Sequence, residues 1–503
     1  MKILTAQQTR EADAYTIENE PVASIDLMER ASRQCFEWIK DHFPNHTPVT
    51  VFAGVGNNGG DGLAIARMLQ EANYSVQVYI VHFSDQHTRD FDTNLSRLTE
   101  VGVHPVVLSE ADHQFELNKD QLVIDAIFGS GLSRPISGFI AGIVKTINAS
   151  ASQVIAIDMP SGLFSESNRG NDGDSIIQAT YTLTFQQPKL AMLFPEHEPY
   201  VGVFNVLDIG LSQSFIETLA TNYFYTDRSL AKSMLHRRSK FSHKGSYGHA
   251  LLICGSQGKM GAAILSATAC LRTGVGLLTM HVPKSGVEIM QTAVPEAMCL
   301  IDEHDERFTR TPDLSKFDAV GVGPGLGTAT DSQQALKFTI QNAETSMIVD
   351  ADALNILSEN PTWLSFLPEG SILTPHPKEF GRLVGKWSDD EERLQLQKDL
   401  AVKHGLVVVL KGANTSVAMP DGSVYFNSTG NPGMATGGSG DVLTGMITSL
   451  LAQGYESHEA AILGVYLHGL TGDLALDREG ENALIASDLV HNIAGAYRVL
   501  EKS

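Results

Sequence analysis

Residues 427–450 have the sequence NSTGNPGMATGGSGDVLTGMITSL, the most informative stretch of the chain. Gly437, Gly438 and Gly440 fall within four positions, Asp441 follows at once, and an apolar helical pattern continues from there. Glycines let a ligand approach the backbone, and a helix start presents free N–H groups and a positive dipole, so the stretch suits an anion. A carboxylate there would repel a phosphate ligand, so its presence makes sense if it removes a proton from a nearby hydroxyl group or holds a metal ion. The alternative for Asp441 is a helix N-cap.

Length and composition narrow the possible classes of protein. The chain has 503 residues, enough for two domains with separate cores. Its net charge of −22 argues against a nucleic-acid-binding surface. None of its four cysteines has the spacing of a CxxC or metal site, so we expect a cytoplasmic protein without disulfides. The N-terminus lacks the apolar run of a signal peptide, and no segment has the length of a membrane span, so no membrane is expected.

The first half of the chain has the pattern of a doubly wound α/β domain. Two helices are expected before residue 45, and a β-branched run at 48–54 then leads through the glycine-rich sequence GVGNNGGDG into a helical pattern, LAIARMLQEA. Asp125 and Asp158 each follow an apolar run, where the carboxyl ends of parallel strands converge. Their oxygens suit an alkali or alkaline-earth cation, and the alternative for each is a helix or turn cap. Further strands are expected at 76–81, 122–129, 154–162, 179–186 and 203–210, with a helix at 136–148.

A second α/β domain is expected after a boundary near Tyr223. Residues 212–235 show no clear β-run, whereas a strand at 250–254, a helix at 263–272 and a strand at 277–282 mark a new start. Three ligand-type turns then follow apolar runs: GVGPGLG (321–327), LTPHPKEF (373–380) and LKGANT (410–415).

Several side chains of this second half have two open interpretations. His376 stands between two prolines, which stiffen its turn and favour ligand contact over a structural role. Asp350 and Asp352 suit either a metal-linked site or helix caps. A basic group faces either phosphates or solvent: Arg237, Arg238, Lys240, His243 and Lys244.

The motifs GNNGGDGL, IDAIFGSGLSRP, IDMPSGL and TFQQPK resemble, in order and spacing, the epimerase domain of the NAD(P)H-hydrate repair enzymes. The resemblance implies a Rossmann-like domain at 1–222 that epimerises the 6-hydroxy centre of hydrated NADH and NADPH. It implies potassium ligands at Asn58, Asp125 and Ser161, and a catalytic carboxylate at Asp158. Lys189 is a second catalytic candidate, with a solvated loop lysine as the alternative. The implied substrate contacts are Asn57, Asn58, Gly59, Gly60, Asp61, Gly129, Ser130, Gly131, Leu132, Ser133, Arg134, Pro135 and Asp158.

Seven motifs of the second half follow the order of the ADP-dependent NAD(P)H-hydrate dehydratases, which are ribokinase-like: HKGSYGHALLICGS, GAAILSA, GVGPGLG, LTPHPKEF, LKGANT, NPGMATGGSGDVLTG and YLHG. The resemblance implies a ribokinase-like domain at 223–503. Ser439 stands where the family more often has threonine. Asp441 would be the catalytic base. ADP, with Mg²⁺, would be bound by Lys411, Gly412, Ala413, Asn414, Thr415 and Gly440, and the hydrated nucleotide by Ala262, Gly325, His376 and Asp441.

Together the two resemblances imply a bifunctional enzyme, an isomerase and a lyase, that repairs hydrated NADH and NADPH. The first domain would interconvert the epimers, and the second would dehydrate the S epimer with ADP. Relatives suggest a homo-oligomer. One alternative is a ribokinase-like kinase for a vitamin precursor, which would release a stable phosphorylated product. Another is a first domain that only senses nucleotides or binds a partner.

Overall fold

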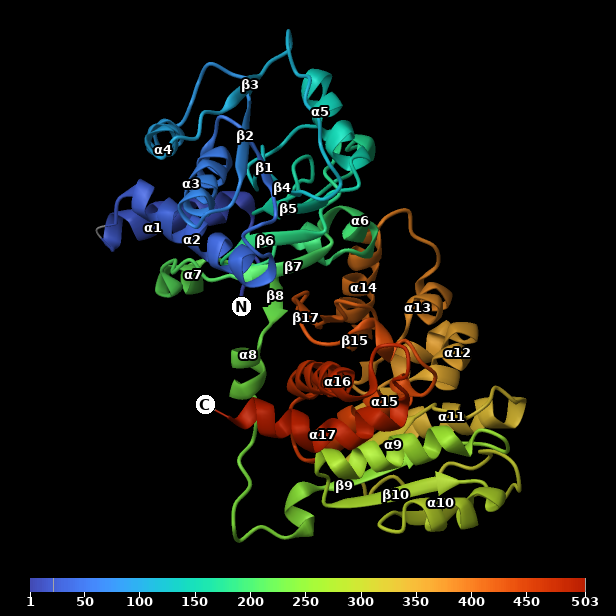
Figure 1. Cartoon of the computed structure of the whole chain (residues 1–503). Helices are drawn as coiled ribbons and strands as arrows, with labels where there is room; N and C mark the ends of the chain where they lie inside the picture. The colour runs from blue at the N-terminus through green and yellow to red at the C-terminus, as the bar shows by residue number, and fades with distance from the viewer. Residues whose placement is uncertain (21, 503) are drawn as a thin grey trace. The chain divides into compact units, whose positions relative to one another are not determined.

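The computed structural model describes residues 1–20 and 22–502 (Figure 1). The chain forms two compact units, one covering Lys2–Thr221 and one that starts at Asn222 and also includes Met1. Within the described residues, no helix combines the length and the apolar character needed to cross a membrane.

The first unit is built on a parallel sheet of seven strands in the order β3-β2-β1-β4-β5-β6-β7. The order reverses between β1 and β4, and in such sheets ligands bind beyond the carboxyl ends of the strands at the reversal. The strands are β1 (Val49–Ala53), β2 (Val76–Val81), β3 (Val106–Leu108), β4 (Leu122–Ala126), β5 (Gln153–Ile157), β6 (Tyr181–Phe185) and β7 (Val203–Leu207).

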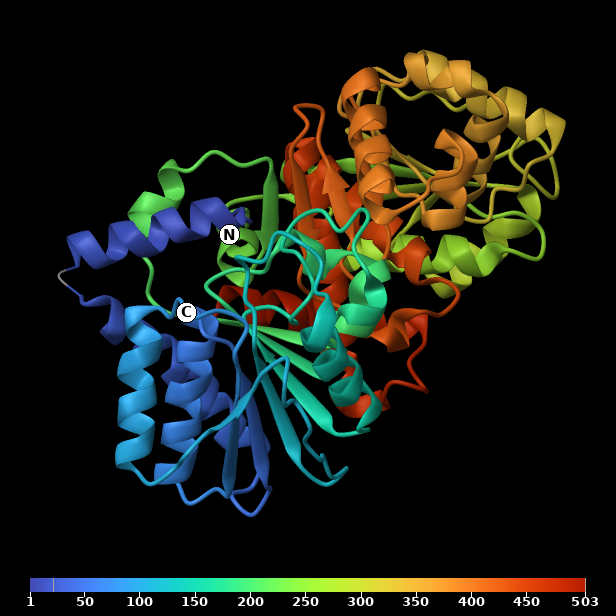
Figure 2. The same cartoon turned by 90° about the horizontal axis from the view of Figure 1, so that it is seen from above.

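Helices cover both faces of this sheet (Figure 2). Apolar side chains of α2, α3 and α4 pack on one face, and those of α5 pack on the other beside Phe52, Val123 and Val154. The helices are α1 (Ala6–Asn19), α2 (Ser24–His42), α3 (Asn57–Glu71), α4 (Arg89–Glu100), α5 (Gly138–Ala149), α6 (Glu198–Val201) and α7 (Gln213–Thr218).

The second unit contains a sheet of ten strands in the order β11-β10-β9-β12-β13-β14-β15-β16-β17-β8. All neighbours are parallel except β16, which is antiparallel to both β15 and β17. The strands are β8 (Tyr223–Thr226), β9 (His249–Ile253), β10 (Leu277–Val282), β11 (Met298–Ile301), β12 (Ala319–Val322), β13 (Met347–Val349), β14 (Ile372–Leu373), β15 (Val407–Leu410), β16 (Ser416–Ala418) and β17 (Val424–Asn427).

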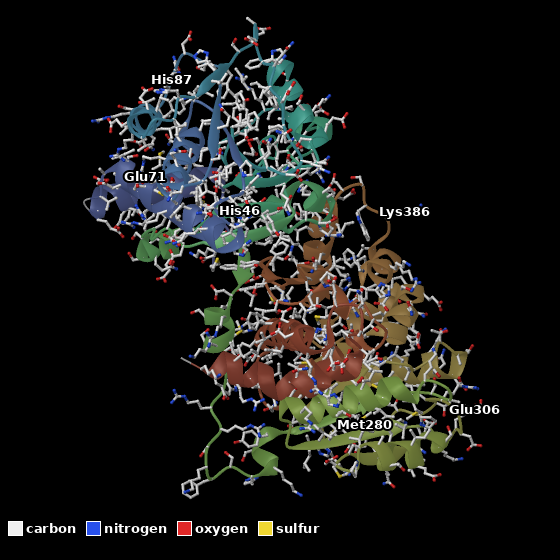
Figure 3. The ribbon with its side chains drawn as sticks, viewed as in Figure 1. His46, Glu71, His87, Met280, Glu306 and Lys386 are labelled. Carbon is white, nitrogen blue, oxygen red and sulfur yellow. The ribbon has the colours of Figure 1, made fainter. Side chains whose placement is uncertain are left out.

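Helix α15 lies at the centre of the second unit, where it packs against α9, α16 and α17 (Figure 1). Met280 of β10 is fully buried in the neighbouring core, whereas Glu306 lies on the surface (Figure 3). The helices are α8 (Arg228–Ser233), α9 (Met260–Thr273), α10 (Val287–Ala293), α11 (Thr330–Asn342), α12 (Ala351–Glu359), α13 (Pro377–Val384), α14 (Asp390–His404), α15 (Ser439–Ala452), α16 (Ser457–Glu479) and α17 (Ala486–Glu501).

Two expectations about local structure are wrong. Residues 212–235 do contain a strand, β8, which pairs in parallel with β17. Its partner lies far along the chain, so the short aromatic run YFYT carries no local signal of pairing. The glycine-rich sequence GNNGGDG is not an extended loop, because α3 already begins at Asn57. The glycines allow this early start: a side chain at Gly59 would overlap the carbonyl oxygen of Gly54.

Helices α9 and α15 are in close contact at Gly445, where a Cβ atom would overlap the carbonyl oxygen of Ser266. We expect Gly445→Ala to destabilise the protein by about 1–3 kcal/mol, because the added methyl group forces the two helices apart. Gly261→Ala is the matched control, since a Cβ at that helical position meets nothing within 4 Å. Thermal unfolding followed by circular dichroism measures both, and equal melting temperatures would contradict this packing.

Candidate functional site

The carboxyl ends of β5 and β6 bring together a buried ion pair. Asp158 follows β5 in the left-handed region of backbone space, with φ of 63°. One of its carboxylate oxygens accepts a hydrogen bond from Lys189 Nζ at 2.6 Å, and the other accepts one from the backbone N–H of Ser130 at 3.0 Å. Burial acts to raise the pKa of Asp158, but the Lys189 ammonium outweighs it and lowers the pKa. Asp158 is therefore a carboxylate at neutral pH.

Lys189 is not a solvated loop lysine, so that alternative is wrong. The residue is 1% exposed, and its Nζ also donates to Thr184 Oγ1 at 2.8 Å and to the carbonyl of Phe185 at 3.1 Å. The chain turns back on itself directly after β6, at Gln186, whose φ is 63°. This turn carries Lys189 inward to Asp158, which the sequence TFQQPK does not reveal by itself.

A second buried carboxylate, Asp125, lies at the end of β4. It accepts hydrogen bonds from the N–H of Ser161 at 2.7 Å, from Ser161 Oγ at 2.6 Å and from the N–H of Ile127 at 3.2 Å. Burial raises the pKa of Asp125 to about 6 while the Ser161 hydrogen bonds oppose the rise. No basic side chain among the described residues pairs with it, so a monovalent cation would balance its charge.

Asn58 and Asp158 both lie close to Gly129, in the loop after β4. A Cβ atom at Gly129 would lie 3.2 Å from Asn58 Oδ1 and 3.2 Å from Asp158 Oδ2, so both side chains would have to shift to admit one. The buried Nδ2 of Asn58 has no hydrogen-bond partner within the described part of the chain. Asn58, Asp125 and Ser161 each carry an oxygen of the hard type that suits potassium, and Ser161 Oγ lies 2.6 Å from Asp125 Oδ1.

The remaining expected contacts of the first unit differ in accessibility. Asn57 is exposed, whereas Gly59, Gly60 and Asp61 are buried in the first turns of α3. Burial raises the pKa of Asp61 well above its usual value, although Ser32 Oγ donates to it at 3.1 Å. The tip of the loop after β4 is exposed to solvent. Leu132 is half-buried, and the exposed residues of this loop are Gly131, Ser133, Arg134 and Pro135.

Asp13, a half-buried residue of α1, was not among the residues predicted for the site. Burial, followed by the negative charge of Asp158, raises the pKa of Asp13 to about 6, whereas Lys189 opposes the rise. Asp13 is therefore a further acid close to the ion pair. No local motif marks it, because its neighbours in space come from a distant part of the chain.

In the second unit, α15 starts inside the glycine run. Gly438 is the N-cap residue, with φ of 96°, so Asp441 is the third helical residue and the N-cap alternative for it is wrong. Within the described residues, the N–H groups of Gly440 and Asp441 have no backbone or side-chain acceptor. The helix start therefore presents two free donors directly beside a carboxylate.

An ion pair between Lys411 and Asp350 borders this helix start. Lys411 Nζ lies 2.9 Å from Asp350 Oδ1, and Thr444 Oγ1 donates to Asp350 Oδ2 at 2.8 Å. A Cβ at Gly440 would lie 3.3 Å from Lys411 Nζ, so the ammonium group reaches the start of α15. Burial and then the charge of Asp350 raise the pKa of Asp441 to about 6, against the opposing charge of Lys411.

Asp350 and Asp352 are both engaged by protein groups. Asp350 occupies the N-cap position of α12 without a side-chain capping bond, so a capping role for it is wrong. Asp352 accepts hydrogen bonds from the N–H of Gly327 at 2.8 Å and from Lys259 Nζ at 3.1 Å. It thereby fixes the GPGLG turn after β12.

The same turn places Gly325 against α9. Gly325 has φ of 65°, and a Cβ there would lie 3.2 Å from Cβ of Ala262, so these two expected contacts are neighbours. Ser256 Oγ donates to the carbonyl of Gly325 at 2.7 Å and holds the turn in place.

His376 and Thr415 already serve local structure. His376 caps α13: its Nδ1 accepts from the N–H groups of Lys378 at 3.1 Å and Glu379 at 3.3 Å. Burial lowers the pKa of His376, so its half-exposed ring is neutral. The hydroxyl of Thr415 closes a turn with the N–H and carbonyl of Gly412, leaving Gly412 and Ala413 exposed and Asn414 half-buried.

His468, in the motif YLHG on α16, has a structural role that was not predicted from the sequence. Its Nε2 lies 2.9 Å from the carbonyl of Ser439, and burial lowers its pKa to about 4, so it is a neutral donor. His468 therefore supports the first turn of α15. The sequence does not predict this contact, because the two residues lie on different helices.

The sequence matches two family models, NAD(P)H-hydrate dehydratase over residues 250–494 and YjeF-related protein N-terminus over residues 24–191. A bifunctional NAD(P)H-hydrate repair enzyme of Moorella thermoacetica is 36% identical, covering 100% of this chain and 98% of the relative. A bifunctional NAD(P)H-hydrate repair enzyme of Thermofilum pendens is 34% identical, covering 100% of this chain and 97% of the relative. A solved ribokinase-like superfamily protein of Enterococcus faecalis is 27% identical with a TM-score of 0.50, covering 56% of this chain and 98% of its own.

We expect Lys189→Met to destabilise the first unit by about 3–5 kcal/mol at pH 7, because it leaves Asp158 buried without its cation. Lys119→Met is the matched control, since Lys119 is exposed and should change stability by less than about 0.5 kcal/mol. Urea unfolding of both variants measures the difference. Equal midpoints would mean that the ion pair does not form.

Asp441 should make the second unit less stable as pH rises from about 4 to about 6. Its pKa is raised from 3.8 to about 6, so the folded chain holds the proton that the unfolded chain has already released in this window. We therefore expect Asp441→Asn to raise the free energy of unfolding at pH 7 by on the order of 2 kcal/mol. The gain should shrink below pH 4; a gain independent of pH would contradict the raised pKa.

Proposed function

The chain belongs to the family of bifunctional NAD(P)H-hydrate repair enzymes, and from this membership we propose a division of labour between its two units. The first unit epimerises the 6-hydroxy centre of hydrated NADH and NADPH. The second dehydrates the S epimer back to the reduced nucleotide. Relatives that match over the full length support repair rather than a vitamin-precursor kinase with a binding module attached. The observation that carries the proposal is Asp441, with its raised pKa, beside the two free N–H groups of α15.

Dehydration by this site begins with a proton transfer. Asp441 takes the proton of the ring hydroxyl, and the oxygen attacks the terminal phosphoryl group of ADP, releasing AMP. The N–H groups of Gly440 and Asp441 donate to the phosphoryl oxygens as negative charge develops, and Lys411 adds its positive charge. The phosphorylated ring then loses phosphate, a far better leaving group than hydroxide, together with a ring proton. The product is the dihydronicotinamide.

The residues proposed to bind the two substrates lie in the turns described above. We propose that Lys411, Gly412, Ala413, Asn414 and Gly440 contact ADP, with the Thr415 hydroxyl shaping the turn that holds them. Ala262 and Gly325 would lie against the hydrated nucleotide, and His376 would present its uncharged ring edge.

Mg²⁺ would neutralise charge on the phosphates of ADP when bound. Asp350 and Asp352 are occupied by Lys411, Thr444, Gly327 and Lys259, so neither offers a ready site for the free ion. We therefore propose that Mg²⁺ arrives with the nucleotide.

In the first unit, Asp158 would take the proton of the 6-hydroxyl group as the C6–N1 bond breaks, leaving an aldehyde at C6 and the electron pair on N1. Attack of N1 on the other face of this aldehyde would re-form the bond with inverted configuration, and Asp158 would return the proton to the oxygen. Its lowered pKa keeps it in the basic form at neutral pH, and Lys189 steadies it. Potassium would be held by Asn58, Asp125 and Ser161, where it would supply positive charge to orient the substrate. We further expect a cytoplasmic homo-oligomer that uses ADP rather than ATP.

Incubating the protein with an epimer mixture of hydrated NADPH, Mg²⁺ and potassium tests the proposal, with ADP or ATP added separately. Recovery of reduced-nicotinamide absorbance beyond the share of the S epimer requires both activities. A stable phosphorylated product without absorbance recovery would instead identify a kinase.

Single substitutions should separate the two activities. We expect Asp441→Asn to lower dehydration at least about 100-fold, because the general base is lost, while epimerisation continues. Asp158→Asn should lower epimerisation while dehydration of the S epimer continues. Each variant is the other's control, and the epimer ratio measured by chromatography follows the first activity while absorbance follows the second. Parallel loss of both activities in either variant would contradict separate sites.

A further inference from the structure

The basic segment of residues 237–244 contains none of the residues assigned to either candidate active site, yet it borders a large open pocket. The chain between α8 and β9 loops out from the body of the second unit (Figure 1). Together with the C-terminal ends of α9, α15 and α17, it lines a half-open pocket of about 1110 Å³.

The charge of this pocket is opposite to that of the protein. Its lining contains four basic side chains, Lys232, Arg237, Arg238 and Arg272, and one acidic side chain, Glu501. The chain as a whole carries a net charge of −22. A concentrated positive cluster in so acidic a protein attracts anions locally, where the rest of the surface repels them.

Two of the arginines have free guanidinium groups. Arg238 is used structurally, because it stacks 3.9 Å from the ring centre of Tyr247 and donates to Gln453 Oε1 at 3.1 Å. Arg237 and Arg272, in contrast, make no ion pair or side-chain hydrogen bond with any described residue. Guanidinium groups left without partners beside a cavity suit the two-pronged recognition of phosphate oxygens.

The other walls of the pocket suit an organic molecule rather than a bare ion. Tyr455 stacks on His236 with ring centres 3.9 Å apart, and Tyr497 donates its hydroxyl to the carbonyl of Thr273 at 3.1 Å. These rings and Leu271 provide fixed apolar surface. The volume is slightly above the usual range of small-molecule sites and far above the need of a single phosphate.

The pocket is distinct from the candidate active site of the same unit. Both α9 and α15 begin at that active site, where they carry Ala262 and Asp441, and both end at the pocket. Each helix has 14 residues, which at 1.5 Å per residue separates the two places by roughly 20 Å.

We propose that this pocket is a second binding site for a phosphorylated organic molecule of nucleotide size, held through Arg237 and Arg272. The proposal does not depend on the repair activity, because the pocket and its charges are independent of Asp441 and Lys411.

Calorimetric titration of the full chain with ATP and with pyrophosphate tests the site, with adenosine as the uncharged probe. We expect the wild-type protein to show one more ATP-binding event than the double variant Arg237→Ala/Arg272→Ala. Adenosine should produce no corresponding event in the wild-type protein. The double substitution should weaken this event by about tenfold for each arginine, and added salt should weaken it in wild type. Lys240→Ala is the matched control, since Lys240 belongs to the same segment but does not line the pocket.

Two results would overturn the proposal. One is identical ATP and pyrophosphate titrations for the double variant and Lys240→Ala. The other is an assembly in sedimentation that depends on Arg237 and Arg272 without any extra ATP binding, because a second copy would then cover the pocket. Unchanged melting temperature and retained dehydration at saturating ADP show that the double variant is folded.

Discussion

The ion pair between Lys411 and Asp350 is the interaction on which the proposed phosphoryl chemistry depends. It joins the end of β15 to the start of α12 at 2.9 Å and is further fixed by Thr444 of α15. Because Asp350 holds Lys411, Asp441 is left as a buried carboxylate without a close cation of its own, and its pKa rises. The same lysine reaches Gly440, so a phosphoryl group at the helix start would meet both an ammonium group and free backbone donors.

The two units use the same type of residue in opposite electrostatic settings. Asp158 and Asp441 both follow a strand or glycine turn at the ligand end of a parallel sheet. Lys189 lies 2.6 Å from Asp158 and lowers its pKa, whereas the lysine nearest Asp441 is paired with another carboxylate. The first acid is held ionised and oriented. The second is a stronger proton acceptor, as a base that activates a hydroxyl group must be.

Much of the fold could be predicted from local pattern, because buried parallel strands are continuous apolar runs. The strands at 76–81 and 277–282 coincide with β2 and β10. What escaped prediction depends on distant partners: β8 pairs with β17, and Lys189 turns inward to Asp158. For the site of the second unit, the sequence motifs pointed to Asp441, Lys411 and Gly440, and these residues lie close together in the structure. They did not reveal Asp13, His468 or the partner of Lys411, since spacing along the chain does not encode those contacts.

The pH dependence of kcat/KM for ADP-dependent dehydration tests whether Asp441 is the general base. If it is, kcat/KM should rise with pH and level off with an apparent pKa of about 6, the value of Asp441. This limb should disappear from the residual activity of Asp441→Asn. A profile that is already level at pH 5, or one whose limb survives the substitution, would contradict the role of Asp441 as the base.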